Sequence, residues 1–264
     1  MSRPKMRRIG DIDPLDLRIL FESYGLEFLP YPIAQYGTRS FGSADKYDAH
    51  AATVRPRFED GDLAIFRSPL AIVLSEPDIR VEYYAHNLVA DEHVHRVAFF
   101  RKGQQACLLR QLGTDDQVEI GTLSAFDIGS AITVMAPPLN PGTLSTVTIE
   151  GYTDSGDDSP EDSCGEDGSE PTVWQRVSSG RALPHIAADE IEAFASVQSD
   201  WRPARNWGRD PDKELIRWVY TKQGTYLVAR DGKTAAPATS AALLTRIDKS
   251  IAADAASLRK TRGS

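Results

Sequence analysis

The chain has 264 residues, of which 41% are hydrophobic, enough for one large or two small domains with a buried core. The net charge of -8 and the pI of about 5.2 argue against general nucleic-acid binding. No apolar run reaches the length of a membrane span, and the basic N-terminus lacks the apolar stretch of a signal peptide. Cys107, in an apolar strand, and Cys164, in an acidic stretch, indicate a reducing compartment. We therefore expect a cytoplasmic protein with an inert, buried Cys107.

The N-terminal part is predicted to be mainly helical. Met6 to Ile12 could form a short strand, and a helix begins after Asp13, with Asp13 at the N-cap and Pro14 at the first helical position. A short helix broken by a proline is expected within Asp48 to Phe58, and another helix, kinked by a proline, within Asp62 to Leu74.

The stretch from Asp78 to Leu123 has the pattern of an antiparallel meander. Asp78 to Asn87 alternates, which places Ile79, Val81 and Tyr83 on one face and Arg80, Glu82 and Tyr84 on the other. Three further strands are predicted at His93 to Phe100, Gln104 to Leu112 and Val118 to Leu123. Short turns rich in Gly and Asp separate these strands, which is typical of antiparallel neighbours rather than of helical crossovers.

A helix and an acidic segment follow the meander. Ser124 to Met135 has helical periodicity, with Ser124 as the expected N-cap. Gly151 to Glu170 is dense in Asp and Glu and contains no Lys or Arg, so it cannot bury a core and is predicted to be a flexible linker. The expected organisation is an N-terminal subdomain (residues 1–150), an acidic flexible loop (151–171) and a C-terminal subdomain (172–264).

The C-terminal half repeats the order of helix, antiparallel strands and closing helix, which suggests two related subdomains that share one sheet. Its predicted elements are a strand at Thr172 to Val177, a helix at Ala187 to Ser196, strands at Trp201 to Gly208, Glu214 to Thr221 and Gly224 to Ala229, a helix at Thr239 to Ala255 and a frayed tail at Ser257 to Ser264. Trp201, Trp207 and Trp218 are interpreted as core packing, or as part of a protein-binding surface.

The sequence offers little catalytic machinery. It contains no glycine-rich phosphate loop, no nucleophile elbow and no zinc-type His-Glu-x-x-His motif. His93 and His95 should point to the same face of their strand, and with His86 across the turn they could hold a metal. We favour the interpretation that they are ordinary strand residues, and predict no catalytic residue, metal or cofactor.

Several segments, in the right order, resemble the EspG family, cytosolic chaperones of the ESX, or type VII, secretion systems of actinobacteria. Asp13 to Pro32 (DPLDLRILFESYGLEFLPYP) resembles the N-terminal helix and Leu-Pro-x-Pro connector of that family. Similar matches occur at Asp78 to Tyr83, Arg96 to Leu112, Ala125 to Ile149 and Gly224 to Pro237. Each motif is weak alone, and their ordered combination carries the resemblance.

The resemblance implies an α+β fold: a central antiparallel β-sheet with pseudo-two-fold related halves, flanked by helical bundles. It also implies a non-enzymatic chaperone that binds the PPE tip of a PE-PPE heterodimer and keeps the dimer soluble for export. No nucleic-acid partner and no membrane insertion are expected, and the free protein would be a monomer or homodimer.

The family's binding regions correspond here to the link between the early strands and to the C-terminal helices. The residues they imply are Val89, Asp91, Glu92, His93, His95, Glu190, Phe194, Arg246 and Lys249. One alternative is a cytosolic interaction module of the same fold with a different client. A less favoured alternative is a metal-dependent enzyme that uses His86, His93 and His95.

Overall fold

One mostly antiparallel sheet runs through the molecule. The structure, a computed structural model, describes residues 4–35, 41–112, 117–149, 183–202 and 209–263. Its strands are β1 (Arg7–Ile12), β2 (Ile79–Asn87), β3 (Glu92–Lys102), β4 (Gln105–Leu112), β5 (Val118–Ser124), β6 (Val147–Ile149), β7 (His185–Ile186), β8 (Ile191–Asp200), β9 (Ile216–Thr221), β10 (Gly224–Val228) and β11 (Thr234–Pro237). Its helices are α1 (Pro14–Ser23), α2 (Ala44–Asp60), α3 (Arg67–Leu74), α4 (Ile128–Met135) and α5 (Ser240–Arg262), with 3-10 turns η1 (Asp62–Phe66) and η2 (Ala188–Glu190).

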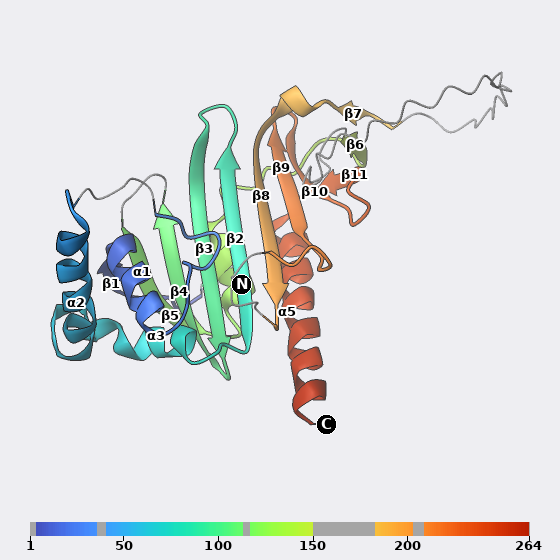
Figure 1. Cartoon of the computed structure of the whole chain (residues 1–264). Helices are drawn as coiled ribbons and strands as arrows, with labels where there is room; N and C mark the ends of the chain where they lie inside the picture. The colour runs from blue at the N-terminus through green and yellow to red at the C-terminus, as the bar shows by residue number, and fades with distance from the viewer. Residues whose placement is uncertain (1–3, 36–40, 113–116, 150–182, 203–208, 264) are drawn as a thin grey trace, which may run out of the picture.

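The eleven strands of the described residues lie in the order β1-β5-β4-β3-β2-β8-β9-β10-β11-β6-β7, and among these strands only β6 and β7 pair in parallel (Figure 1). The predicted meander is confirmed in β2 to β5, and β8 to β11 form a second one. The two meanders run outward from the central β2–β8 pair. Helix α4 follows the first meander in the chain, and α5 follows the second. The predicted α+β class with a central antiparallel sheet is therefore confirmed.

The predicted helix at Ala187 to Ser196 is wrong. These residues form η2 and the first part of β8, which pairs with β2 on one side and with β9 on the other. Two neighbouring strands satisfy the backbone hydrogen bonds of β8, and residues 195–200 are buried. Contacts distant in sequence therefore override the local preference for helix.

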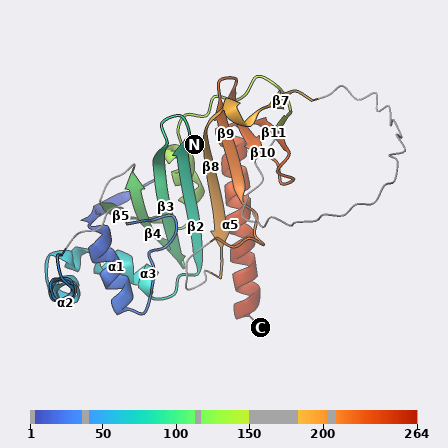
Figure 2. The same ribbon diagram turned by 45° about the horizontal axis from the view of Figure 1, so that its top comes forward.

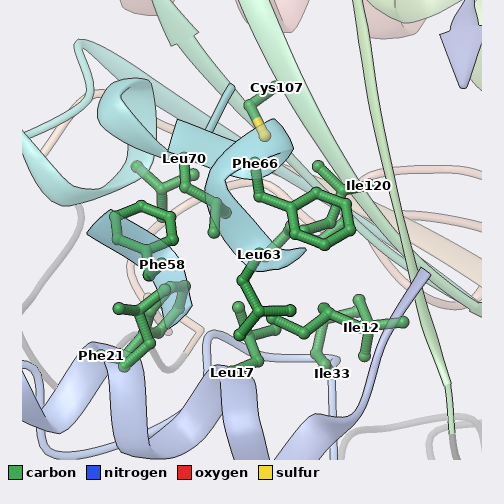
Figure 3. Close-up of a cluster of buried hydrophobic side chains, with 14 of the residues drawn as sticks. Ile12, Leu17, Phe21, Ile33, Phe58, Leu63, Phe66, Leu70, Cys107 and Ile120 are labelled. Atoms are coloured by element: carbon green, nitrogen blue, oxygen red, sulfur yellow. The ribbon is translucent and has the colours of Figure 1, made fainter. Parts of the chain in front are cut away.

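The N-terminal helices cover one face of the sheet near β1, β5 and β4. Asp13 caps α1, because its Oδ1 accepts a hydrogen bond of 2.8 Å from the backbone nitrogen of Leu15, and Pro14 starts the helix as predicted. Side chains from α1, α2, η1 and α3 meet those of the sheet in one buried cluster (Figure 3). Phe21, Phe66 and Leu70 are among its buried members. This lobe lies at the far end of the sheet from β8 and β9 (Figure 1).

Two predictions for this lobe are corrected. The expected short helix is the 17-residue α2, which continues through Pro56. Asp62 to Leu74 is not one kinked helix but η1 followed by α3, with Pro69 in the first turn of α3. Proline is tolerated there because the first backbone N–H groups of a helix have no intrahelical acceptor.

Helices α4 and α5 cover the other face of the sheet, with α5 lying along β8 and β9 (Figure 2). Trp218 is fully buried in this second core, where its ring stacks on Tyr83 at 5.9 Å between centroids, so the core-packing interpretation of this tryptophan is confirmed. Helix α4 begins at Ile128 after Asp127, not after Ser124 as predicted; the Ser124 hydroxyl instead accepts a hydrogen bond from Phe126 N.

The C-terminal tail is helical to Arg262, and the prediction of a frayed tail from residue 257 is wrong. Arg262 Nη2 lies 2.6 Å from Oδ1 of Asp78, and basic residues fill the last turn of α5, where they complement the helix dipole. Within the described ranges, no helix combines the length and apolarity needed to cross a membrane. The predicted acidic loop, Cys164, Trp207, the strand at Thr172 to Val177 and most of Trp201 to Gly208 lie outside the described residues.

Candidate protein-binding surface

The tip of the β2–β3 hairpin presents an exposed apolar side chain on a fixed turn. Asn87 Oδ1 accepts hydrogen bonds from the backbone nitrogens of Val89, at 3.0 Å, and Ala90, at 3.1 Å. Asp91 has a φ of 50°, the left-handed conformation that closes the turn. The side chain of Val89 is 78% exposed. The turn is thus fixed by its own hydrogen bonds, and Val89 is free to contact another molecule.

The second meander also holds this tip. The backbone nitrogen of Leu88 donates a hydrogen bond of 2.9 Å to the carbonyl oxygen of Glu192, which belongs to β8. Glu190 lies next to this contact in η2, where its side chain accepts a hydrogen bond of 2.9 Å from Ala187 N. The hairpin tip and the start of β8 therefore form one continuous surface.

A bulge in β3 reverses the predicted orientation of the histidines. Ala85 pairs with His95 and His86 pairs with His93, so Val94 has no partner on β2. The extra residue breaks the alternation of side chains. The ring of His93 lies 5.7 Å from Tyr84, whereas the ring of His95 lies 5.7 Å from Tyr83 on the opposite face. The prediction that His93 and His95 share a face is wrong.

His93 instead packs in an aromatic cluster below the tip. Its Nδ1 lies 2.7 Å from the Tyr84 hydroxyl and 3.1 Å from Nδ1 of His86. His86 Nε2 is 3.3 Å from Asp91 Oδ1, and the ring of Phe194 is 5.7 Å from that of His86. Burial, followed by the positive charge that His86 can carry, lowers the pKa of His93, while Asp91 opposes this effect. A neutral His93 imidazole therefore suits this cluster.

The three histidines do not form a metal site in this arrangement. His95 is separated from His86 and His93 by the sheet itself, and burial lowers its pKa, with a further contribution from the charge of Arg110. Nowhere in the described part of the chain do three or more His, Cys, Asp or Glu side chains gather as metal ligands would. The geometry does not support the alternative of a metal-dependent enzyme at this cluster.

The remaining predicted partner-binding residues fall into two groups. Glu92, next to Asp91, is exposed at the hairpin, and Phe194 packs beneath it. Arg246 lies elsewhere: its Nε is 3.0 Å from Glu214 Oε1, and its Nη1 donates to the carbonyl oxygen of Val228. Val228 lies at the end of β10, and Glu214 lies just before the start of β9. These ends of the two strands point away from the hairpin tip. Lys249 is exposed one turn further along α5. The structure therefore does not bring the α5 residues to the hairpin.

A polar band of mostly buried side chains, formed by Arg80, Glu82, Ser196, Gln198 and Arg209, lies on the same face as Tyr84 and His86. Arg80 Nη2 is 2.7 Å from Glu82 Oε1, and the Arg209 guanidinium is 2.6 Å from the Ser196 hydroxyl. Burial raises the pKa of Glu82 to about 7, although Arg80 and Arg209 act in the opposite direction. The alternating pattern of β2 placed Arg80 and Glu82 on a polar face, but gave no sign that this face is buried.

This band ties the N-terminal connector to the strands beneath the hairpin. The guanidinium of Arg209 lies 4.8 Å from the ring centroid of Tyr31, which in turn lies 6.2 Å from the ring of Tyr84. Gln198 Oε1 accepts a hydrogen bond of 2.8 Å from Asp210 N. Loops from both halves thus hold the base of the hairpin, which limits its movement relative to the sheet.

An α+β fold with an exposed apolar side chain on a hydrogen-bonded hairpin tip suits a protein that binds another protein. The sequence matches the EspG family over residues 13–249, and the chain belongs to that family. No curated protein matches it. A solved structure that resembles it is that of the Mycobacterium tuberculosis type VII secretion system chaperone EspG5 in complex with the PE25-PPE41 dimer. That alignment has a TM-score of 0.44 and 11% sequence identity, and covers 91% of this chain and 94% of that chain.

Proposed function

We propose that this protein is a cytoplasmic chaperone of type VII secretion that binds the PPE subunit of a PE-PPE heterodimer and keeps the dimer soluble for export. Membership of the EspG family supports the proposal. The class of client is the one implied by the family resemblance, and a PE-PPE dimer is also the partner named for EspG5. The protein would act by binding alone, without a chemical step.

The observation that carries the proposal is the exposed tip of the β2–β3 hairpin. Val89, 78% exposed, and Leu88, 42% exposed, place apolar surface on a turn fixed by Asn87 and β8. Apolar side chains that are held in place lose little conformational entropy on binding, so a larger share of the gain from burial appears as affinity. A chaperone that covers an apolar client tip also shifts the client from aggregate to soluble complex by mass action.

Co-expression with PE-PPE pairs from the same genome tests the proposed client. We expect a stable ternary complex by size exclusion and mass determination, together with a larger soluble fraction of the pair. If several pairs stay insoluble or elute apart from the chaperone, the client assignment is overturned. An unbiased pull-down would then identify a different client of the same fold.

A triple variant tests the proposed interface. Val89→Ala and Asp91→Asn change the tip, and His93→Gln changes the cluster below it; none of the three residues is fully buried. We expect the ternary complex to be lost while the unfolding midpoint of the chaperone changes little. The matched control is Lys46→Ala, because Lys46 is exposed on α2, in the N-terminal lobe away from the hairpin. Unchanged client binding by the triple variant would exclude the hairpin as the interface.

A further inference from the structure

A groove of about 740 Å³ lies between α3 and the start of β1, in the N-terminal lobe. Ile9, Ile65, Pro69 and Ile72 contribute apolar side chains to its lining. The side chain of Ile65 is 58% exposed, which is unusual for an isoleucine next to a well-packed cluster. The groove therefore offers apolar surface that the protein itself leaves uncovered.

The same groove is positively charged. Lys5, Arg7 and Arg8 line it, and none of the described residues in its lining is acidic. Arg8 forms an ion pair with Asp11, and its Nε lies 3.4 Å from Oε2 of Glu119. Lys5 and Arg7 form no ion pair within the described part of the chain. In a protein with a net charge of -8, a groove whose charged lining residues are all cationic is a local exception. It would attract a negatively charged ligand.

Hydroxyl groups complete the lining. Thr122 and Ser124, at the end of β5, line the groove together with Ser68 from α3. The Ser124 oxygen already accepts a hydrogen bond from Phe126 N at 3.3 Å, so its own proton can be donated to a ligand. Hydroxyl donors beside Lys5 and Arg7 suit carboxylates, and the apolar wall suits a hydrophobic side chain next to them.

We propose that this groove binds an extended acidic peptide that carries apolar residues among its carboxylates. Small-molecule sites normally enclose most of their ligand, whereas exposed Lys5, Arg7 and Ile65 leave this groove open along one side. An extended peptide needs contacts on one side only, and its alternate side chains can contact the apolar wall and the cationic rim in turn. This site is separate from the β2–β3 hairpin and does not depend on the proposed chaperone function.

The test uses fluorescence anisotropy with the full-length protein. The probe is a fluorescein-labelled octapeptide in which Glu or Asp alternates with Leu. We expect saturable binding that weakens as salt rises from about 50 to about 300 mM, because the Debye length shortens. The same peptide with Gln and Asn in place of the acids should bind at least about tenfold more weakly. Equal binding of the two peptides would overturn the proposal.

Charge reversal locates the site. Lys5→Glu with Arg7→Glu should weaken binding of the acidic probe at least about tenfold. The matched control, Arg259→Glu with Lys260→Glu, makes the same change in net charge at the end of α5 and should bind like the unmodified protein. Equal losses in both double variants would indicate a nonspecific charge effect and overturn the assignment.

A second variant tests the site without a change in its cations, and a competition experiment distinguishes a peptide ligand from a small anion. Ile65→Asp introduces a carboxylate at a position that is 58% exposed, so the protein should fold while the probe is repelled. Inorganic triphosphate should displace the probe only weakly, because it cannot use the apolar wall. Full displacement by triphosphate at concentrations below those of the unlabelled peptide would assign the groove to small anions and refute the peptide ligand.

Discussion

Lys213→Met should destabilise the protein markedly, because Lys213 neutralises two buried carboxylates that join α5 to the sheet. Its Nζ lies 2.8 Å from Asp200 Oδ1 at the end of β8 and 2.9 Å from Asp254 Oδ1 in α5. The side chains of Asp200 and Asp254 are only 6% and 12% exposed. Without the lysine, two negative charges would remain close together in a poorly hydrated site.

The expected decrease in the free energy of unfolding follows from the burial of these two carboxylates. Removal of one partner from a buried ion pair costs about 3–5 kcal/mol, and we expect the lower end because Lys213 is itself 21% exposed. The hydrogen bond of 2.5 Å from the Ser199 hydroxyl to Asp254 survives and limits the damage. For a chain of this size, a loss of about 3 kcal/mol corresponds to a fall in melting temperature of roughly 6–12 °C.

Urea unfolding of the full-length protein measures the free energy of unfolding. Adding Asp254→Asn to Lys213→Met should recover part of the loss, since one of the two unpaired charges is then removed. Arg230→Met is the matched control, because the Arg230 side chain is 73% exposed beside Glu214 and its removal should cost far less stability. A Lys213→Met variant no less stable than this control would refute the reasoning.

Three further predictions concern exposure and protonation. Val89→Asp should weaken client binding by roughly tenfold or more in a pull-down titration without lowering stability, whereas Ile65→Asp, also at an exposed position, should not. Because the pKa of His93 is lowered from 6.5 by burial and by His86, the hairpin should lose stability as the pH falls below about 6.5. Hydrogen exchange of the hairpin amides, corrected for intrinsic rates, should show this loss, and His93→Gln should remove it. Burial raises the pKa of Cys107 well above its ordinary value, so the thiol should react with Ellman's reagent only after unfolding.

The parts of the fold that could be predicted are those with local signals. Strands β2 to β5 alternate with a period of two and are separated by turn residues, and α1 has a recognisable cap in Asp13 and Pro14. Strand β8 has no such signal, because its state is decided by pairing with β2 and β9. Helix α5 extends past Ala255 to Arg262, whose Nη2 lies 2.6 Å from Asp78, 184 residues earlier in the chain, and no local pattern shows this contact.

The candidate site was predictable as a region but not as a set of side-chain positions. The short turn after Asn87 marks a hairpin tip, and Val89 is exposed there. The orientation of His93 depends on a single extra residue, Val94, and no local pattern distinguishes a bulged strand from a regular one. Arg246 was expected at a partner surface, but it is held within the chain by Glu214.

The central β2–β8 pair would allow a short turn to serve as the proposed binding element in this architecture. An isolated two-stranded hairpin is marginally stable in water, and its tip would lose considerable conformational entropy on binding. Here β2 is paired on both sides, the backbone of Leu88 is bonded to β8, and the polar band around Glu82 and Arg209 holds loops from both halves against the base. The entropy of ordering the tip is therefore lost during folding rather than during binding. Changes to β8 that leave Val89 untouched should consequently weaken client binding as well.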